Sequence, residues 1–183
     1  MLDQQDDKEL LLQFKNEGSR EAAFTSIIKK YQEKLYWHIR RMVVEHEDAN
    51  DVLQNLFIKV WKNLENFRED SQLYTWLYRI ATNESLTFLE QQKKRSAISI
   101  SDEDNLMGNK LKADSNFDGN KLEWKLQLAI QSLPEKQKAV FNLRYYDEMP
   151  YEEMSRVLGT SEGALKASYH HAVKKIEDYI LNR

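Results

Sequence analysis

Cysteine is absent from the sequence, which excludes disulfide bonds and cysteine-based zinc sites and fits a reducing compartment. Glycine and proline, the residues that most often interrupt regular structure, number only five and two among 183 residues. Hydrophobic residues make up 41% of the chain and charged residues 31%, so the composition is not that of a disordered protein. Together these features predict a globular chain of long helices joined by short turns.

Long apolar runs are also absent, since none approaches the roughly 20 residues that span a membrane. The first ten residues, MLDQQDDKEL, are acidic and lack the apolar core of a secretory signal. We therefore expect a cytoplasmic protein without direct membrane insertion. A basic excess is missing as well, because the net charge is -3. This balance argues against strong DNA binding by the protein alone.

Apolar residues recur at steps of three and four in both halves of the chain but not between them. The intervening stretch is net acidic, contains two glycines and shows no sustained periodicity. Such a composition is typical of a linker. We therefore expect an all-α protein with two small helical domains, residues 1–95 and 121–183, joined by a flexible acidic linker at residues 96–120.

Each half is expected to contain four helices. In the first half, one helix ends at Gly18, the next is capped by Ser19, and two more occupy residues 49–64 and 73–92. Helices in the second half are expected at residues 122–133, 134–146, 151–158 and 162–181. Pro134 suits the first position of its helix, and Pro150 marks the start of the helix at residues 151–158.

The second half contains the pattern of a helix-turn-helix, in which two helices are joined by the short turn Gly159-Thr160-Ser161. Gly159 can adopt the left-handed geometry that ends the first helix, and Ser161 or Thr160 can cap the second. Apolar residues at steps of four and three predict the buried stripe of the second helix: Leu165, Tyr169, Ala172, Ile176 and Ile180.

The opposite side of this last helix carries small and polar residues. Small residues at its start suit entry into the major groove of DNA by the N-terminal end of the helix. Its lysines can contact phosphates, and Ser168, His170 and His171 can hydrogen-bond. A plain helical hairpin with a solvated outer face is the alternative.

Neither a metal site nor an active site is expected. His170 and His171 are adjacent, so their side chains diverge, whereas a helical zinc site needs histidines at i and i+4. The sequence also lacks a cysteine nucleophile, a phosphate-binding glycine loop and metal-ligand spacing. We therefore expect no enzyme and no cofactor.

Aromatic and basic residues interleave in the stretch NFREDSQLYTWLYRIATNESLTFLEQQKKR, from Asn66 to Arg95. Aromatic rings with cationic neighbours suit single-stranded DNA, because bases stack on rings and phosphates pair with cations. The alternative is that Tyr74, Trp76 and Tyr78 are core side chains of an ordinary helix.

Three motifs resemble those of the extracytoplasmic-function (ECF) sigma factors of bacterial RNA polymerase. FREDSQLYTWLYRIATN is similar to the promoter-melting segment of the family's region two, and DANDVLQNLFIKVW is similar to its polymerase-binding helix. LPEKQKAVFNLRYYDEMPYEEMSRVLGTSEGALKASYHHAVKKI is similar to region four, the family's second DNA-recognising domain. The resemblance implies a factor that binds core polymerase and directs promoter-specific transcription initiation.

The resemblance also implies partners and site residues. The partners are the beta-prime coiled coil and beta flap of core RNA polymerase, promoter DNA in single-stranded and duplex form, and an anti-sigma protein. The minus-ten element would be recognised as a melted strand by Phe67, Arg68, Tyr74, Trp76, Arg79 and Asn83. The minus-thirty-five element would be recognised as duplex by Lys166, Ala167, Ser168, His170, His171 and Lys174. The polymerase would be bound by Asp51, Gln54 and Asn55.

The last helix departs from the family's pattern, because many members carry several arginines where this chain has alanine, serine and histidine. Fewer bidentate contacts to guanine are therefore expected. Two rival functions each explain one part of the chain. A stand-alone helix-turn-helix regulator accounts for residues 133–183 but not for the aromatic cluster at residues 67–78. A helical interaction module accounts only for residues 48–61.

Overall fold

A computed structural model describes residues 2–96 and 121–182, and this described part is all-α, as predicted. The first half contains α1 (Leu2–Lys15), α2 (Arg20–Val43), α3 (His46–Asn63), the short 3-10 helix η1 (Leu64–Asn66) and α4 (Leu73–Ser96). The second half contains α6 (Lys121–Gln131), α7 (Glu135–Tyr145), α8 (Tyr151–Leu158) and α9 (Glu162–Asn182). The predicted linker, apart from Ser96, lies outside the described residues.

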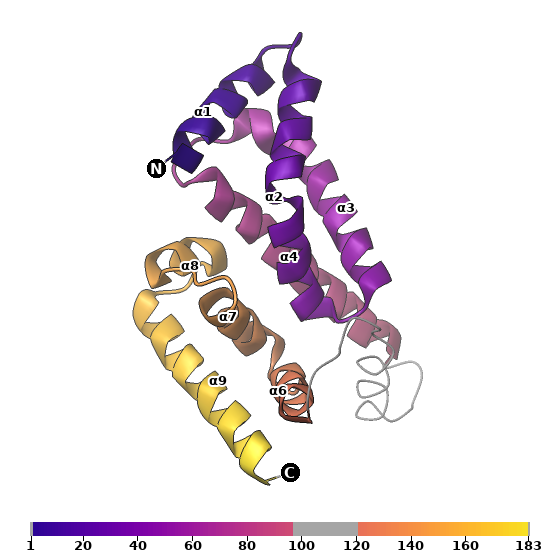
Figure 1. Ribbon diagram of the computed structural model, residues 1–183, viewed down its shortest axis with the longest axis vertical. Helices are drawn as coiled ribbons and strands as arrows, with labels where there is room; N and C mark the ends of the chain where they lie inside the picture. The colour runs from indigo at the N-terminus through magenta and orange to yellow at the C-terminus, as the bar shows by residue number, and fades with distance from the viewer. Residues whose placement is uncertain (1, 97–120, 183) are drawn as a thin grey trace.

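Helix α2 is the centre of the first half and packs against α1, α3 and α4 (Figure 1). Its periodic apolar residues are buried as the spacing predicts: Ala23, Ile27, Tyr31, Leu35, Ile39 and Met42. One local expectation is wrong. Ser19 precedes α2, but its hydroxyl donates to the carbonyl oxygen of Gln13 at 2.8 Å instead of capping the helix. This bond closes the turn between the two helices, and α1 ends at Lys15, before Gly18.

The second half is built on α7 and α9, with α8 and α9 forming the predicted helix-turn-helix. Gly159 has a φ of 63°, which is the left-handed conformation expected after α8. The hydroxyl of Ser161 accepts a hydrogen bond from the Ala164 amide at 3.3 Å, so it is Ser161 that caps α9. Leu165 and Ala172 are buried within the predicted stripe.

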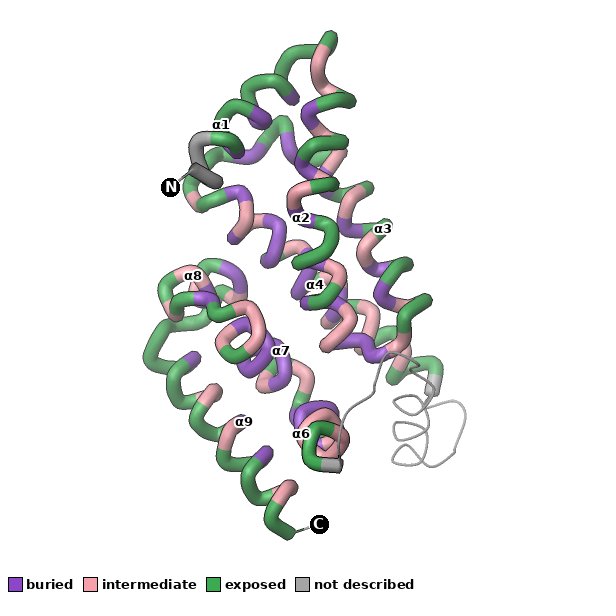
Figure 2. Tube along the Cα trace, viewed as in Figure 1, coloured by how far each residue is buried: buried purple, intermediate pink, exposed green. Residues whose placement is uncertain are grey.

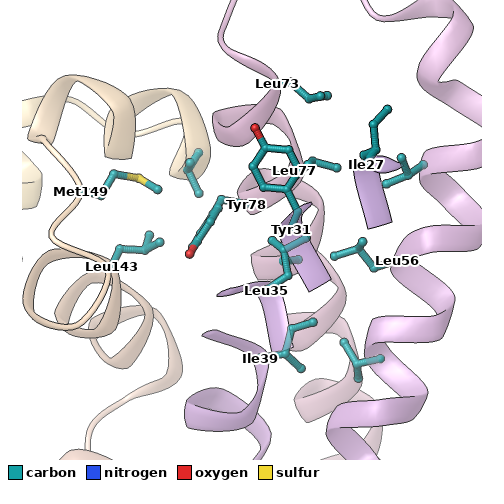
Figure 3. Packing of buried hydrophobic residues seen from close by; sticks show 14 of the residues in the cluster. Ile27, Tyr31, Leu35, Ile39, Leu56, Leu73, Leu77, Tyr78, Leu143 and Met149 are labelled. Carbon is teal, nitrogen blue, oxygen red and sulfur yellow. The ribbon is translucent and has the colours of Figure 1, made fainter. Parts of the chain in front are cut away.

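The two halves pack against one another. Helix α8 contacts α4, and α7 contacts both α2 and α4. One continuous core therefore contains residues of both halves, and Figure 3 shows Tyr78 of α4 extending towards Leu143 and Met149 of the second half. Leu143 and Met149 are fully buried. In this closed arrangement α9 lies on the outer side of the second half, away from the first (Figure 1).

Candidate nucleic-acid and protein interfaces

A cleft of about 510 Å³ opens where the segment after η1 meets α4. Five of the six residues predicted for the minus-ten element line it: Phe67, Arg68, Trp76, Arg79 and Asn83. Residues 76, 79 and 83 share a face of α4 because they are three and four positions apart. The segment before α4 brings the other two residues to that same face. The structure thus gathers into one place residues that the sequence spreads over 17 positions, from 67 to 83.

An aromatic pair forms part of the cleft wall. The rings of Phe67 and Trp76 lie 5.2 Å apart, centroid to centroid, with an angle of 44° between their planes. Phe67 is 9% exposed and Trp76 is half-buried. Packing on Phe67 therefore fixes the position of Trp76, while part of the indole stays open to the cleft. A ring held in this way can stack with an unpaired base at little cost in side-chain entropy.

The charges in the cleft are mixed. Lys59 is paired with Glu84, with 2.5 Å between Nζ and Oε1. Arg68 and Arg79 are exposed and have no ion-pair partner within the described part of the chain. Two unpaired guanidinium groups beside an aromatic ring suit a nucleic-acid strand, because they can neutralise phosphates that flank a stacked base.

Tyr74, the sixth predicted residue, does not line this cleft. It lies against Tyr78, with 4.9 Å between ring centroids. Burial, followed by the negative charges of Asp147 and Glu153 in the second half, raises the pKa of Tyr74 to about 12. The aromatic cluster is thus divided: Trp76 lies in the cleft, and Tyr74 and Tyr78 lie in the contact between the halves.

A second cleft of about 310 Å³ adjoins the first and shares Trp76 and Arg79 with it. One of its walls is Arg156 of α8. Close by, the Thr75 hydroxyl of α4 donates to the carboxylate of Glu153, also in α8. The second half therefore reaches the edge of the first cleft in the closed arrangement.

The predicted DNA-contacting residues of α9 lie on its outer side, which Figure 2 shows as exposed along most of the helix. Lys166, Ala167, His170, His171 and Lys174 are exposed, and Ser168 is half-buried. Lys166, His170 and Lys174 are four positions apart and form one stripe of this side, and Ala167 and His171, also four apart, form the neighbouring stripe. No group of three or more metal-ligating side chains occurs in the part of the chain that the structure describes.

The predicted polymerase-binding residues are exposed on α3, on the side turned away from α2. Asp51, Gln54 and Asn55 all face solvent. The next turn of this face carries Ile58, which is 47% exposed and which the sequence analysis missed. Its position, three and four residues after Asn55 and Gln54, was the available signal. An exposed apolar side chain beside polar ones is a feature of protein interfaces.

A polar network that was not predicted from the sequence joins His38 and Arg41 of α2 to Asp147 of the second half. These positions are more than 100 residues apart in sequence, and no local pattern links them. Within residues 2–96 and 121–182, no helix has the length and apolar character needed to span a membrane.

Two family models match the chain: "Sigma-70 region 2" over residues 27–95 and "Sigma-70, region 4" over residues 123–176. The RNA polymerase sigma-H factor of Pseudomonas aeruginosa is 31% identical over 185 residues, covering 97% of this chain and 95% of the relative. The ECF RNA polymerase sigma-E factor of Escherichia coli K12 is 33% identical over 166 residues, covering 86% of each chain.

Two solved structures share the fold. CnrH, in complex with the cytosolic domain of CnrY, matches with a TM-score of 0.68 and 21% identity, covering 94% of this chain and 95% of that one. The sigma factor RpoE of Bartonella quintana, in complex with the anti-sigma factor NepR, matches with a TM-score of 0.65 and 19% identity, covering 86% and 96%.

Proposed function

This chain belongs to the extracytoplasmic-function family of RNA polymerase sigma factors, and we propose that its two halves divide promoter recognition between them. The protein binds core RNA polymerase and directs promoter-specific initiation. Sigma factors are initiation factors and not enzymes. We assign residues 1–95 to polymerase binding and the minus-ten element, residues 121–183 to the minus-thirty-five element, and residues 96–120 to the linker.

The cleft beside α4 is the proposed site for the melted minus-ten strand. The observation that carries this proposal is the convergence of Phe67, Arg68, Trp76, Arg79 and Asn83 on one cleft of about 510 Å³. Unstacking a base costs a few kcal/mol, and stacking it on an aromatic side chain returns about 1–3 kcal/mol. A single fixed indole can therefore offset much of the cost of one base step, without ATP.

The outer face of α9 is the proposed site for the minus-thirty-five duplex. Lys166 and Lys174 are exposed there and can pair with phosphates. The predicted contact residues include no arginine, so few bidentate contacts to guanine are available. Recognition would then rest more on phosphate positioning and on the shape of the DNA.

The exposed face of α3 is the proposed docking surface for the beta-prime coiled coil, formed by Asp51, Gln54, Asn55 and Ile58. The beta flap would hold the second half. Two proteins of this fold, CnrH and RpoE, have been solved with CnrY and NepR bound. We propose an anti-sigma partner here too, and action in the cytoplasm, where the polymerase is.

Promoter recognition requires the two halves to separate. The elements at minus ten and minus thirty-five are about 25 base pairs apart, or about 85 Å at 3.4 Å per pair. In the closed arrangement Arg156 shares a cleft with Trp76. The seven residue steps from Arg156 to Gly163, at the start of α9, span at most about 25 Å. The closed form cannot place Trp76 and α9 on both elements of a straight duplex.

In vitro transcription with sigma-free bacterial core polymerase tests this function. Holoenzyme would be assembled with the protein and given sheared genomic DNA, and the 5′ ends of the transcripts would be sequenced. We expect a small set of defined start sites. On one such promoter, Trp76→Ala should reduce transcription about tenfold or more, the equivalent of one lost stacking contact.

Two controls make the result specific to melting. A template with a pre-melted minus-ten region should restore transcription by the Trp76→Ala protein, because the cost of unstacking has been removed. Trp37→Ala alters an exposed tryptophan on α2, outside the cleft, and should leave transcription unchanged. Specific, salt-resistant promoter binding by the free protein would instead favour a stand-alone regulator.

A further inference from the structure

An exposed tyrosine ends α7 beside the helix-turn-helix. Tyr145 is 51% exposed, whereas the ring centroid of the next residue, Tyr146, lies 4.4 Å from the guanidinium of Arg41 in the first half. The two side chains therefore turn to different sides of the second half. The Tyr145 hydroxyl has no hydrogen-bond partner within residues 2–96 and 121–182. An aromatic ring at the surface with a hydroxyl to donate is suited to a polar partner.

Ring contacts hold Tyr145 in place and connect it to α9. The Tyr145 ring stacks on Phe141, with 5.1 Å between the centroids and 17° between the planes. Phe141, which is 4% exposed, also stacks on Tyr169 of α9, at 5.8 Å and 16°. The exposed phenol is therefore fixed relative to α9. A contact made by its hydroxyl costs little side-chain entropy for this reason.

Tyr145 lies at the edge of the proposed duplex-binding face of α9. Tyr169 comes three residues after Lys166, so its ring borders that face. Burial raises the pKa of Tyr169, and Tyr151, Arg144 and Tyr145 lie close enough to influence it as well. The Nζ of Lys166 and the guanidinium of Arg144 lie 5.5 and 5.2 Å from the ring centroid of Tyr151. Two cations and the exposed phenol thus share one edge between α7 and α9.

The dimensions of the major groove place DNA phosphates at this edge. An α-helix with its side chains is about 10–12 Å across, and the major groove of B-DNA is about 12 Å wide. A helix seated in the groove fills it, so side chains along the edges of the helix meet the phosphate backbones that form the walls. Arg144 donates to the carbonyl oxygen of Met149 at 3.3 Å, which holds its positive charge at this edge. Lys166 adds a second positive charge, 3.6 Å from the carboxylate of Glu162.

We propose that Tyr145 binds a phosphate of the minus-thirty-five duplex and fixes how α9 sits in the groove. Its hydroxyl donates a hydrogen bond to a phosphate oxygen, and the stacked rings connect that contact to Tyr169 and α9. The predicted contact residues of α9 include no arginine, so contacts beside the helix carry more of the positioning. This inference rests on the proposed function of α9.

Binding of holoenzyme to a duplex promoter, measured by fluorescence anisotropy, tests the contact. Tyr145→Phe keeps the stacked ring and removes the hydroxyl, and should weaken binding about tenfold. The salt slope should stay as in the wild type, because a neutral donor releases no counterion. The phosphates around the minus-thirty-five element would then be replaced one at a time by neutral methylphosphonates. At one position the replacement should weaken the wild type about tenfold more than it weakens Tyr145→Phe.

Two further variants serve as controls. Tyr179→Phe removes a phenol hydroxyl near the opposite end of α9 and should bind the promoter as the wild type does. Lys166→Ala removes a charge from the same edge as Tyr145 and should reduce the salt slope by about one. The two edge variants therefore differ in their salt dependence, which separates a neutral donor from a cation.

The outcomes distinguish this contact from the proposed function. Tyr145→Phe that binds the promoter as tightly as the wild type, or that keeps wild-type sensitivity to every methylphosphonate, would overturn the contact and leave the function of α9 standing. A loss of affinity for core polymerase in Tyr145→Phe would also overturn it, because the hydroxyl would then bind protein. Failure of the wild-type holoenzyme to bind any promoter would refute the proposed function, and this contact with it.

Discussion

Replacement of Lys138 by methionine should stabilise the protein at neutral pH. Lys138 is a lysine of α7 that is only 4% exposed, and its Nζ donates to Oε1 of Gln131 at 2.7 Å. Burial lowers its pKa from 10.5 to about 8, with only partial compensation from Glu135. A lysine whose pKa is lower in the folded state than in the unfolded state reduces the free energy of unfolding at every pH at which the unfolded chain carries its charge.

The sign and size of this effect follow from proton linkage. Between pH 8 and 10.5 the unfolded state binds more protons at this site than the folded state, so stability rises with pH. A shift of about 2.5 pH units corresponds to a cost of about 3 kcal/mol at pH 7. About 2 kcal/mol of that cost is removed by pH 9.5. Burial raises the pKa values of Tyr74 and Tyr146. These tyrosines therefore lower the free energy of unfolding only above about pH 10, outside the range of the experiment.

Urea unfolding at pH 7 and pH 9.5, followed by circular dichroism, measures both quantities. The wild type should gain about 2 kcal/mol of unfolding free energy over this range. Lys138→Met should be about 2 kcal/mol more stable than the wild type at pH 7, after about 1 kcal/mol is subtracted for the lost bond to Gln131. Its stability should be nearly independent of pH.

The matched control is Lys136→Met, which changes an exposed lysine of the same helix. It should leave both the stability and its pH dependence as in the wild type. The reasoning is refuted if wild-type stability is flat or falls between pH 7 and pH 9.5. It is also refuted if Lys138→Met destabilises the protein at pH 7 while Lys136→Met does not.

Five further substitutions test the turn before α9 and the proposed surfaces. Gly159→Ala places a side chain at a φ of 63° and should cost about 1 kcal/mol of stability in thermal unfolding. At Gly163 an added methyl group meets no atom within 4 Å, so Gly163→Ala should stabilise α9 by up to about 1 kcal/mol. The same methyl group should weaken minus-thirty-five binding, because it would hold the helix away from the groove. Ile58→Asp should abolish co-elution with core polymerase on size exclusion, and Lys62→Asp, one turn further along α3, should have a smaller effect. Lys174→Ala should weaken holoenzyme binding to all promoters alike and reduce the salt slope by about one.

The helices and their buried faces were predictable because each depends on residues three and four positions apart. The face of α2 and the capped turn before α9 follow from such local rules, and the structure confirms them. The cleft was predictable in its residues but not in its shape. Nothing local shows that Phe67 packs on Trp76 or that Tyr74 turns towards the second half.

The contact between the halves was not predictable from the sequence. Leu143 and Met149 have the pattern of core residues, which fits packing within their own half as well as packing against the other. No local sequence pattern sets His38 or Asp147 apart. Only the tertiary structure brings Nδ1 of His38 to 2.7 Å from Oδ2 of Asp147. Polar contacts of this kind depend on the register of two surfaces, which the periodicity of a single helix does not specify.

Helix α4 presents different residues to the cleft and to the second half. Trp76, Arg79 and Asn83 face the cleft, while Tyr78 contacts Asp147, which follows α7, and Thr75 bonds to Glu153 of α8. The side chains that would bind a melted strand therefore remain accessible while the second half covers the opposite face. A strand entering the cleft would meet Arg156 at the edge of the cleft. Ion pairs with Glu152 and Glu153 hold the Arg156 side chain there. Separation of the halves would remove that wall, so separation of the halves and loading of the cleft would be linked.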